Sequence, residues 1–329
     1  MAVSFHVGCL PNRPIEACLE MGRRAEELAY AGIWVADSHS LMRDVYSILS
    51  VLAIQTKKLQ LASGVTLTVT RHPAVLANSW ATLQELSGGR AICGIGVGES
   101  AVYNLGLKPE RLVVFEEKLT VIRTLLRGDS VVYEGSELQM PWSGTEVPLI
   151  MASSGPKSLQ LAGRIADGVL FQVGAEPRLV QYALDNIRTG AESVGRRLSD
   201  IKLYMRVATS IHEDRETAQQ ALKGYISVAA GTVFKTVPRT YFADDLYEDL
   251  SQFKAAYDYA DHGSNDAVHS DLLTDRIFNA MAIACPPAEA IQRFRALADM
   301  GIDDFVLPFG MTDPISSMET FAEQVCPHV

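Results

Sequence analysis

The sequence lacks the features that mark a secreted, zinc-binding or membrane-spanning protein. Its five cysteines are widely spaced and odd in number, and there is no CxxC pair, so neither a zinc ribbon nor a disulfide framework is indicated. No apolar run approaches the ~20 residues that a membrane span requires. The first residues contain no basic segment followed by a long apolar run, so we expect no secretory signal and a cytoplasmic location.

Clustered positive charge is also missing. The 29 Lys and Arg residues are outnumbered by 39 Asp and Glu residues, and the net charge of −10 is scattered along the chain. Nucleic acid binding requires clustered Lys and Arg, so we expect no nucleic acid partner and no membrane partner. A small-molecule substrate is compatible with this composition, because net charge says little about an individual pocket.

Short apolar runs alternate with longer amphipathic ones along the 329 residues. This regular alternation predicts parallel strands covered by helices, either as a closed (β/α)8 TIM barrel or as an open doubly wound sheet. Eight units in a chain of this length favour the barrel. The predicted strands lie at residues 3–7, 32–36, 59–62, 91–95, 149–152, 168–172, 201–211 and 305–308.

No linker rich in Pro, Gly and Ser divides the chain, so we expect one domain over residues 1–329. The largest irregular segment, at about 213–275, follows the seventh strand and is too long for one crossover helix. Long insertions in this fold usually cover the mouth of the active site. We therefore interpret this segment as an active-site lid.

Polar residues and glycines follow the predicted strands at their carboxyl ends, where a parallel barrel carries its active site. The seventh strand contains Arg206 within an otherwise apolar run. The other candidates are Asp37, Ser38 and His39 after the second strand, Gly64, Val65 and Thr66 after the third, Gly98 and Glu99 after the fourth, Ser153, Ser154 and Gly155 after the fifth, and Gly174 and Ala175 after the sixth.

Structural explanations compete with functional ones for these residues. The glycines Gly94, Gly96 and Gly98 do not complete a dinucleotide-binding G-x-G-x-x-G, since Ala101 occupies the last position, and closely crossing strands would also require glycine. The residues at 153–155 could bind an anion at a helix N-terminus or simply cap the helix. Without a G-x-S-x-G elbow or enough metal ligands, the residues alone indicate a barrel enzyme with an anion site.

Several segments resemble, in order, the luciferase-like flavin-dependent oxidoreductases and monooxygenases, a family that includes bacterial luciferase and methylenetetrahydromethanopterin reductase. The most specific are LSGGR at 86–90 and GIGVGE at 94–99. Three further segments support the resemblance: TRHP at 70–73, SSGPK at 153–157 and AGRIADG at 162–168. Within the family, these segments are most similar to those of the methanopterin reductases.

This resemblance implies a TIM barrel, often dimeric, that binds a reduced flavin or deazaflavin in the barrel mouth. Gly64–Val65 matches the place where the family often has a non-prolyl cis peptide behind the ring, with Thr66 facing the ring. Asp37 and Gly98 would also be on the cofactor side. The cofactor phosphate would be surrounded by Ser153, Ser154 and Gly155, together with Gly174 and Ala175.

The resemblance also suggests catalytic residues. Glu99 matches a carboxylate that acts as an acid in some deazaflavin-dependent members. Members on that side often have Asp-His after the second strand, whereas this chain has Asp37-Ser38-His39, so either Ser38 or His39 would take the catalytic place.

Two mechanisms fit the implied architecture. The first is FMN-dependent monooxygenation of a small organic substrate through a flavin hydroperoxide, with a separate flavin reductase as a partner. The alternative is hydride transfer from coenzyme F420, a 5-deazaflavin that reacts poorly with O2, with Glu99 or His39 supplying a proton. The breadth of the family favours the first. A hydrolase or lyase using Glu99 and His39 without a redox cofactor is the second alternative.

Overall fold

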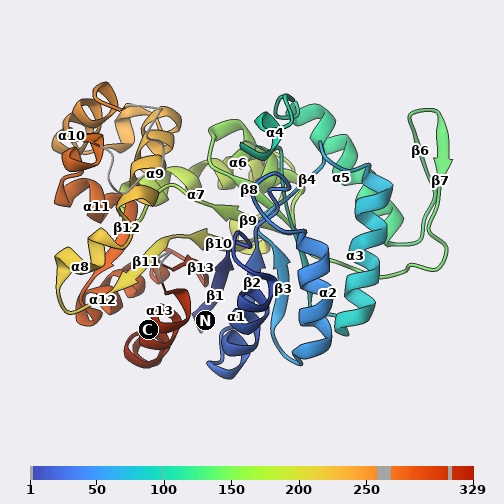
Figure 1. The fold of residues 1–329 in the computed structure, drawn as a ribbon. Coiled ribbons are helices and arrows are strands. Elements are labelled where there is room, and N and C mark those ends of the chain that lie inside the picture. The colour runs from blue at the N-terminus through green and yellow to red at the C-terminus, as the bar shows by residue number, and fades with distance from the viewer. Residues whose placement is uncertain (1–2, 99, 258–267, 310–312) are drawn as a thin grey trace. The chain divides into compact units, whose positions relative to one another are not determined.

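The computed structural model describes residues 3–98, 100–257, 268–309 and 313–329. The strand order is β3-β2-β1-β13-β10-β9-β8-β5-β4, and a further pairing of β5 with β3 closes the sheet (Figure 1). The two-residue strand β4 (Thr66–Leu67) pairs in parallel with the end of β5. The predicted (β/α)8 TIM barrel is therefore confirmed. Its strands are β1 (Ser4–Cys9), β2 (Gly32–Val35), β3 (Gln60–Ser63), β5 (Ala91–Gly96), β8 (Leu149–Ser153), β9 (Gly168–Phe171), β10 (Lys202–Arg206) and β13 (Asp304–Pro308).

The chain divides into two compact units. The N-terminal unit comprises residues 6–152 and 165–169, and the C-terminal unit comprises residues 3–5, 153–164 and 170–329. The expectation of one domain over residues 1–329 stays a prediction.

In the N-terminal unit, the helices begin and end where local signals place them. The Asp44 carboxylate accepts a hydrogen bond of 2.8 Å from the Ser47 amide and caps α2. Pro73 lies in the first turn of α3, which ends at Gly88 with φ of 66°. The helices are α1 (Ile15–Glu27), α2 (Val45–Gln55), α3 (Pro73–Ser87), α4 (Ser100–Tyr103) and α5 (Leu112–Leu126). After α5, the strands β6 (Val131–Tyr133) and β7 (Ser136–Leu138) form an antiparallel hairpin.

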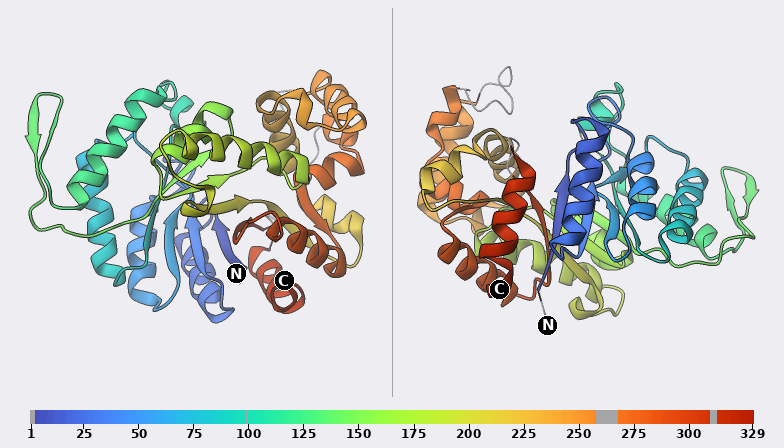
Figure 2. Two further views of the ribbon diagram at one scale, coloured as in Figure 1. Left: turned by 180° about the vertical axis from the view of Figure 1, so that it is seen from behind. Right: turned by 60° about the horizontal axis from the view of Figure 1, so that its bottom comes forward.

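In the C-terminal unit, aromatic side chains form much of the core. The Phe5 ring meets Phe294 at 5.3 Å and Phe321 at 4.9 Å between centroids, both edge to face. The helices of the insertion, α9, α10 and α11, pack on one another (Figure 2). The helices of this unit are α6 (Pro156–Ile165), α7 (Pro177–Glu192), α8 (Arg215–Gln220), α9 (Lys223–Thr236), α10 (Asp244–Ala255), α11 (Asp275–Met281), α12 (Pro287–Ala298) and α13 (Pro314–Gln324).

One predicted strand is wrong as a single element. The run at 201–211 forms two strands, β10 in the barrel and β11 (Ala208–Ile211), which pairs in parallel with β12 (Ala282–Cys285) in a separate sheet. The apolar pattern continues across the break because both strands are buried. Sequence analysis also missed β12, since this four-residue run follows α11 directly, without a Gly or Pro between them.

Helices α6 and α7 approach each other closely through two glycines. A Cβ atom on Gly190 would lie 1.9 Å from the carbonyl oxygen of Gln160, and one on Gly163 would lie 2.2 Å from that of Ile187. Both obstacles are backbone atoms, so only a shift of a helix could accommodate a side chain. These glycines therefore set the spacing of the two helices.

We expect Gly190→Ala to lower the free energy of unfolding by about 1–3 kcal/mol, as overpacking of a close contact does. Urea denaturation followed by circular dichroism measures this change. Gly231→Ala in α9 is the matched control, because no atom lies within 4 Å of its Cβ position, and it should be neutral or stabilising. Equal stabilities of the two variants would contradict the role given to Gly190.

Candidate functional site

In the N-terminal unit, the residues after β2 and β3 meet around the carboxylate of Asp37. Thr66 donates a hydrogen bond of 2.9 Å from Oγ1 to Asp37 Oδ2, and Arg71 donates one of 2.5 Å from Nη1 to the same oxygen. Thr66 is fully buried and the Asp37 side chain is 5% exposed. A buried carboxylate needs a partner of opposite charge, and Arg71 supplies it.

Tyr46 and Arg71 complete this cluster. The Tyr46 hydroxyl lies 3.1 Å from Thr66 Oγ1, and the Arg71 guanidinium lies 4.8 Å from the centre of the Tyr46 ring. Burial raises the pKa of Tyr46. Because Thr66 donates its single hydroxyl proton to Asp37, Tyr46 is the donor in its bond with Thr66. Burial lowers the pKa of Arg71, but the Asp37 and Asp44 carboxylates outweigh it, and the net shift is upward.

Ser38 and His39 have different surroundings, although they are adjacent in the sequence. Ser38 is 8% exposed, and its hydroxyl has no hydrogen-bond partner among the described residues. His39 is exposed. A buried hydroxyl without a partner is uncommon, and it makes Ser38 the candidate for contact with a bound molecule.

The peptide bond between Gly64 and Val65 is cis, as the family resemblance implies. Gly98 has a structural explanation, since it adopts φ of 85° and a Cβ there would lie 2.3 Å from Val102 Cγ2. The candidate acid Glu99 lies outside the described residues.

In the C-terminal unit, the serines after β8 are bound to the protein backbone. Ser153 donates from Oγ to the carbonyl of Ser158 at 3.2 Å, and Ser154 donates to that of Gln172 at 3.0 Å. An anion at this place would therefore meet the amide groups at the start of α6 rather than the serine protons. A Cβ at Gly155 would be in ordinary van der Waals contact with Ser158 Oγ at 3.7 Å and Thr236 Cγ2 at 3.8 Å, so a side chain can be introduced there without a clash at its Cβ.

Gly174 and Ala175 are engaged within the protein. The amides of Ala175 and Glu176 both donate to the carbonyl of Ala280, at 2.6 and 3.2 Å. A Cβ on Gly174 would lie 2.4 Å from that same oxygen. This segment is therefore hydrogen-bonded to the last turn of α11.

In the N-terminal unit, sequence analysis missed an ion pair between Glu110 and Lys118, whose side chains are 10% and 15% exposed. Glu110 accepts hydrogen bonds of 2.5 Å from both Thr68 and Lys118, and Lys118 also donates to the Thr68 carbonyl at 3.1 Å. Nothing in the local sequence pairs Thr68 with residues about 40 to 50 positions away.

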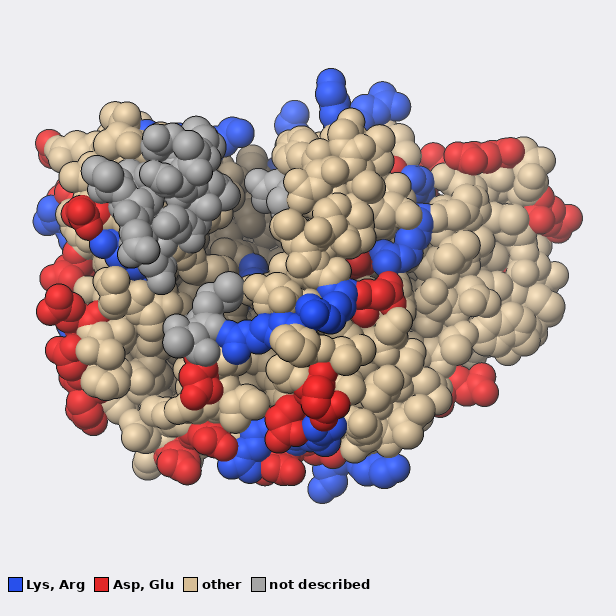
Figure 3. All heavy atoms as spheres, in the orientation of Figure 1, with Lys and Arg blue, Asp and Glu red and all other residues tan. Residues whose placement is uncertain are grey.

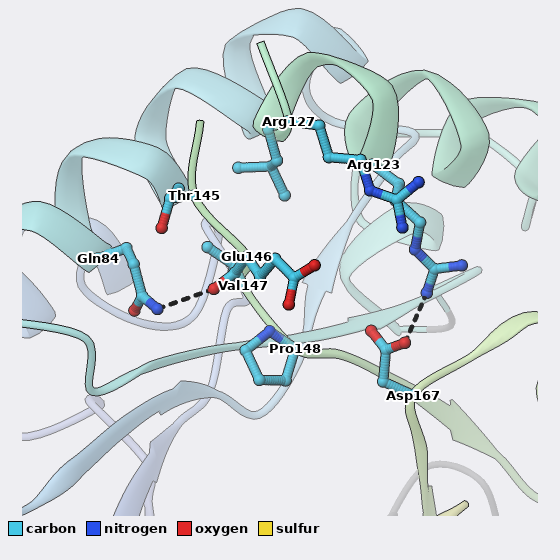
Figure 4. A pocket seen from close by; sticks show the side chains of 9 residues that line it. Gln84, Arg123, Arg127, Thr145, Glu146, Val147, Pro148 and Asp167 are labelled. Atoms are coloured by element: carbon cyan, nitrogen blue, oxygen red, sulfur yellow. Dashed lines mark hydrogen bonds and ion pairs between the residues drawn. The ribbon is translucent and has the colours of Figure 1, made fainter. Parts of the chain in front are cut away.

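A cavity of about 340 Å³ lies at the opposite ends of the strands (Figure 4). Pro148 and Asp167 in its wall immediately precede β8 and β9. Arg123 donates to Asp167 at 3.0 Å, and Asp167 also accepts from the Leu149 amide at 2.9 Å. Because barrel enzymes act at the carboxyl ends of their strands, we do not assign this cavity to the active site.

Acidic and basic side chains are interspersed on the face drawn in Figure 3, and α1 carries ion pairs such as Arg23–Glu16 at 2.7 Å. Within the described part of the chain, no group of three or more His, Cys, Asp or Glu residues is placed to hold a metal ion. No helix among the residues with described positions is long and apolar enough to cross a bilayer.

The barrel, the cis peptide and the polar strand ends define a TIM-barrel enzyme of the luciferase-like oxidoreductase type. The family model described as luciferase-like monooxygenase matches residues 3–304. The chain belongs to this family.

Relatives and solved structures agree with this membership. The chain is 30% identical to a 5,10-methylenetetrahydromethanopterin reductase of Methanolobus tindarius over 92% of this chain and 93% of that protein. It is 25% identical to an F420-dependent glucose-6-phosphate dehydrogenase of Microbacterium testaceum, covering 94% and 92%. The coenzyme F420 dependent tetrahydromethanopterin reductase from Methanopyrus kandleri has the same fold, with a TM-score of 0.83, 24% identity and coverage of 100% and 99%.

We expect Arg71→Met to lower the free energy of unfolding by about 3–5 kcal/mol, because it leaves the Asp37 carboxylate buried with only the Thr66 hydroxyl. The double variant Asp37→Asn with Arg71→Met should lose less than Arg71→Met alone, since no unpaired charge remains. Urea denaturation of the wild type, both single variants and the double variant measures the coupling. Additive losses would show that the pair is not coupled.

Proposed function

We propose that this protein is a coenzyme F420-dependent oxidoreductase that transfers hydride between the deazaflavin and a C=C, C=N or C=O bond of a small organic molecule. The observation that carries the proposal is the similarity, over 85 to 94% of this chain, to relatives whose names state F420 as the coenzyme. These relatives favour F420-dependent hydride transfer, the alternative reached in the sequence analysis, over FMN-dependent monooxygenation.

The residues at the strand ends fit such a cofactor. Thr66 and the buried Ser38 hydroxyl, next to the Gly64–Val65 peptide, would contact the ring side. The amides at the start of α6, next to Gly155, would accept its phosphate. Gly174 and Ala175, which the family resemblance also suggested, are left out because the amide of Ala175 is already bonded.

Bound deazaflavin supplies or accepts the hydride, and the chain supplies the rest. Tyr46 donates to Thr66 and Thr66 donates to Asp37, so the Thr66 hydroxyl is held in one direction. Arg71 neutralises Asp37 and keeps a negative charge from developing beside the ring. Glu99 is the proposed proton donor or acceptor, with Ser38 as a hydrogen-bond donor and His39 as the exposed alternative for proton transfer.

FMN-dependent monooxygenation with a separate flavin reductase is the second candidate, and the description of the family model favours it. Separate titrations with F420 and FMN distinguish the two, followed by absorbance and fluorescence. We expect micromolar or tighter binding of F420 and weaker binding of FMN. Tight binding of FMN alone would overturn the F420 proposal, and binding of neither would overturn both. Turnover without either cofactor would point to a hydrolase or lyase.

We expect Gly155→Asp to weaken F420 binding at least tenfold, because a carboxylate would repel the phosphate expected there. Gly155→Asn is the matched control, since it has nearly the same shape without the charge. Fluorescence titration measures both affinities, and circular dichroism confirms that both variants fold. Equal affinities of the two variants would place the phosphate elsewhere.

We also propose that the protein forms a homodimer through the outer side of α3. Val75 and Leu86 on this helix are 54% and 43% exposed, and Trp142 beside its C-terminal end is 52% exposed. Together with the dimers common in this family, this apolar surface favours a second copy as the partner.

We expect light scattering after size exclusion to give twice the chain mass of 35.9 kDa, and Val75→Asp with Leu86→Asp to give the monomer mass. Val194→Asp is the control, because Val194 is equally exposed at 51% but belongs to the C-terminal unit. A monomeric wild type would contradict the dimer.

A further inference from the structure

Arg206 is a half-buried cation without a counter-charge. It is the last residue of β10, and among the described residues its side chain donates a hydrogen bond only to Gln172, from Nη1 to Oε1 at 2.8 Å. No carboxylate among the described residues lies within ion-pair distance of it. Arg71, in the N-terminal unit, differs in having two carboxylate partners, Asp37 and Asp44. A partly buried guanidinium that is bound to one neutral amide can still bind an anion through its remaining N–H groups and its positive charge.

Tyr225 adds a second group without a partner. The Arg206 guanidinium lies 5.7 Å from the centre of the Tyr225 ring, which belongs to α9 of the insertion. The Tyr225 hydroxyl is buried and has no hydrogen-bond partner in the described structure. A buried phenol usually finds a partner, so this one is available to a ligand.

Gln172 connects this pair to the residues after β8. Its backbone carbonyl accepts the Ser154 hydroxyl, and its side chain holds Arg206 Nη1. All these residues belong to the C-terminal unit. Because Gln172 occupies one nitrogen of the guanidinium, the Nε–Nη2 edge remains for two oxygens of one anion. That edge matches the bidentate geometry of carboxylates and phosphates.

We propose that Arg206 and Tyr225 form an anion subsite that binds a phosphate or carboxylate group of a ligand, with Gln172 orienting the guanidinium. The inference rests on the proposed function, in which the anion belongs either to the acidic tail of F420 or to an acidic substrate.

The test compares Arg206→Met, Arg206→Lys and Tyr225→Phe with the wild type. The probes are F420, the deazaflavin nucleoside that lacks the phosphate tail, and inorganic phosphate added to the F420 complex. Calorimetry measures each dissociation constant, and thermal unfolding confirms that each variant folds. Arg197→Met is the control for net charge, because the Arg197 side chain is 81% exposed and pairs with Asp200.

If the anion is the cofactor tail, Arg206→Met should weaken F420 binding about 10- to 100-fold and leave the nucleoside unchanged, as loss of a charged hydrogen bond does. If it belongs to the substrate, Arg206→Met should leave both cofactors unchanged and abolish phosphate binding to the F420 complex. In either case Arg206→Lys should retain part of the affinity, Tyr225→Phe should lose less than Arg206→Met, and Arg197→Met should match the wild type.

Affinities of Arg206→Met equal to the wild type for all three probes would overturn the anion subsite. Equal weakening of F420 and the nucleoside would also overturn it, because that pattern reports a general loss of structure. Failure of the proposed function is a separate result, since a wild type that binds neither cofactor can still be titrated with phosphate alone.

Discussion

The barrel depends on the close approach of two backbones where β3 meets β5. Leu61 and Ala62 pair with Ala91 and Ile92, and two residues further along a Cβ on Gly94 would lie only 2.0 Å from the Ser63 carbonyl oxygen. Ser63 also donates from Oγ to the Gly94 carbonyl at 2.6 Å. Any larger residue would separate the strands at the point where the sheet closes. Gly94 therefore serves the closure of the sheet.

Closure has a chemical consequence at the end of β3. The chain leaves this strand through the cis peptide of Gly64–Val65, and the next residue places its hydroxyl on Asp37 from the end of β2. Arg71 then compensates the charge of Asp37. Thus one carboxylate organises the hydroxyl of Thr66, while Ser38 beside it keeps an unused hydroxyl. The Arg71 guanidinium therefore lies between two carboxylates, those of Asp37 and Asp44, and compensates the buried one directly.

The C-terminal unit presents a different chemistry. Its strand ends carry amides at the start of α6, the uncompensated cation of Arg206 and the buried phenol of Tyr225. These groups favour an anion, whereas the cluster around Asp37 favours a neutral partner.

Local sequence patterns predicted the barrel, because the alternation of apolar runs and amphipathic helices depends only on neighbouring residues. The same reasoning found the strand ends, and the family resemblance added the cis peptide. It could not find the split between β10 and β11, because burial on both sides leaves no change of pattern at Val207. Nor could it pair Glu110 with Lys118 and Thr68, since folding alone brings these residues together.

The amino-acid sequence by itself determined the succession of strands and helices and the positions at which polar residues interrupt the strand ends. Tertiary structure decided which of those residues form hydrogen bonds within the protein, as the amide of Ala175 does. It also decided which residues keep hydrogen-bonding groups free for a ligand, as Ser38, Arg206 and Tyr225 do. The reason is physical. A pattern reports whether a residue is polar, but only its neighbours in space determine whether its donors and charges are already satisfied.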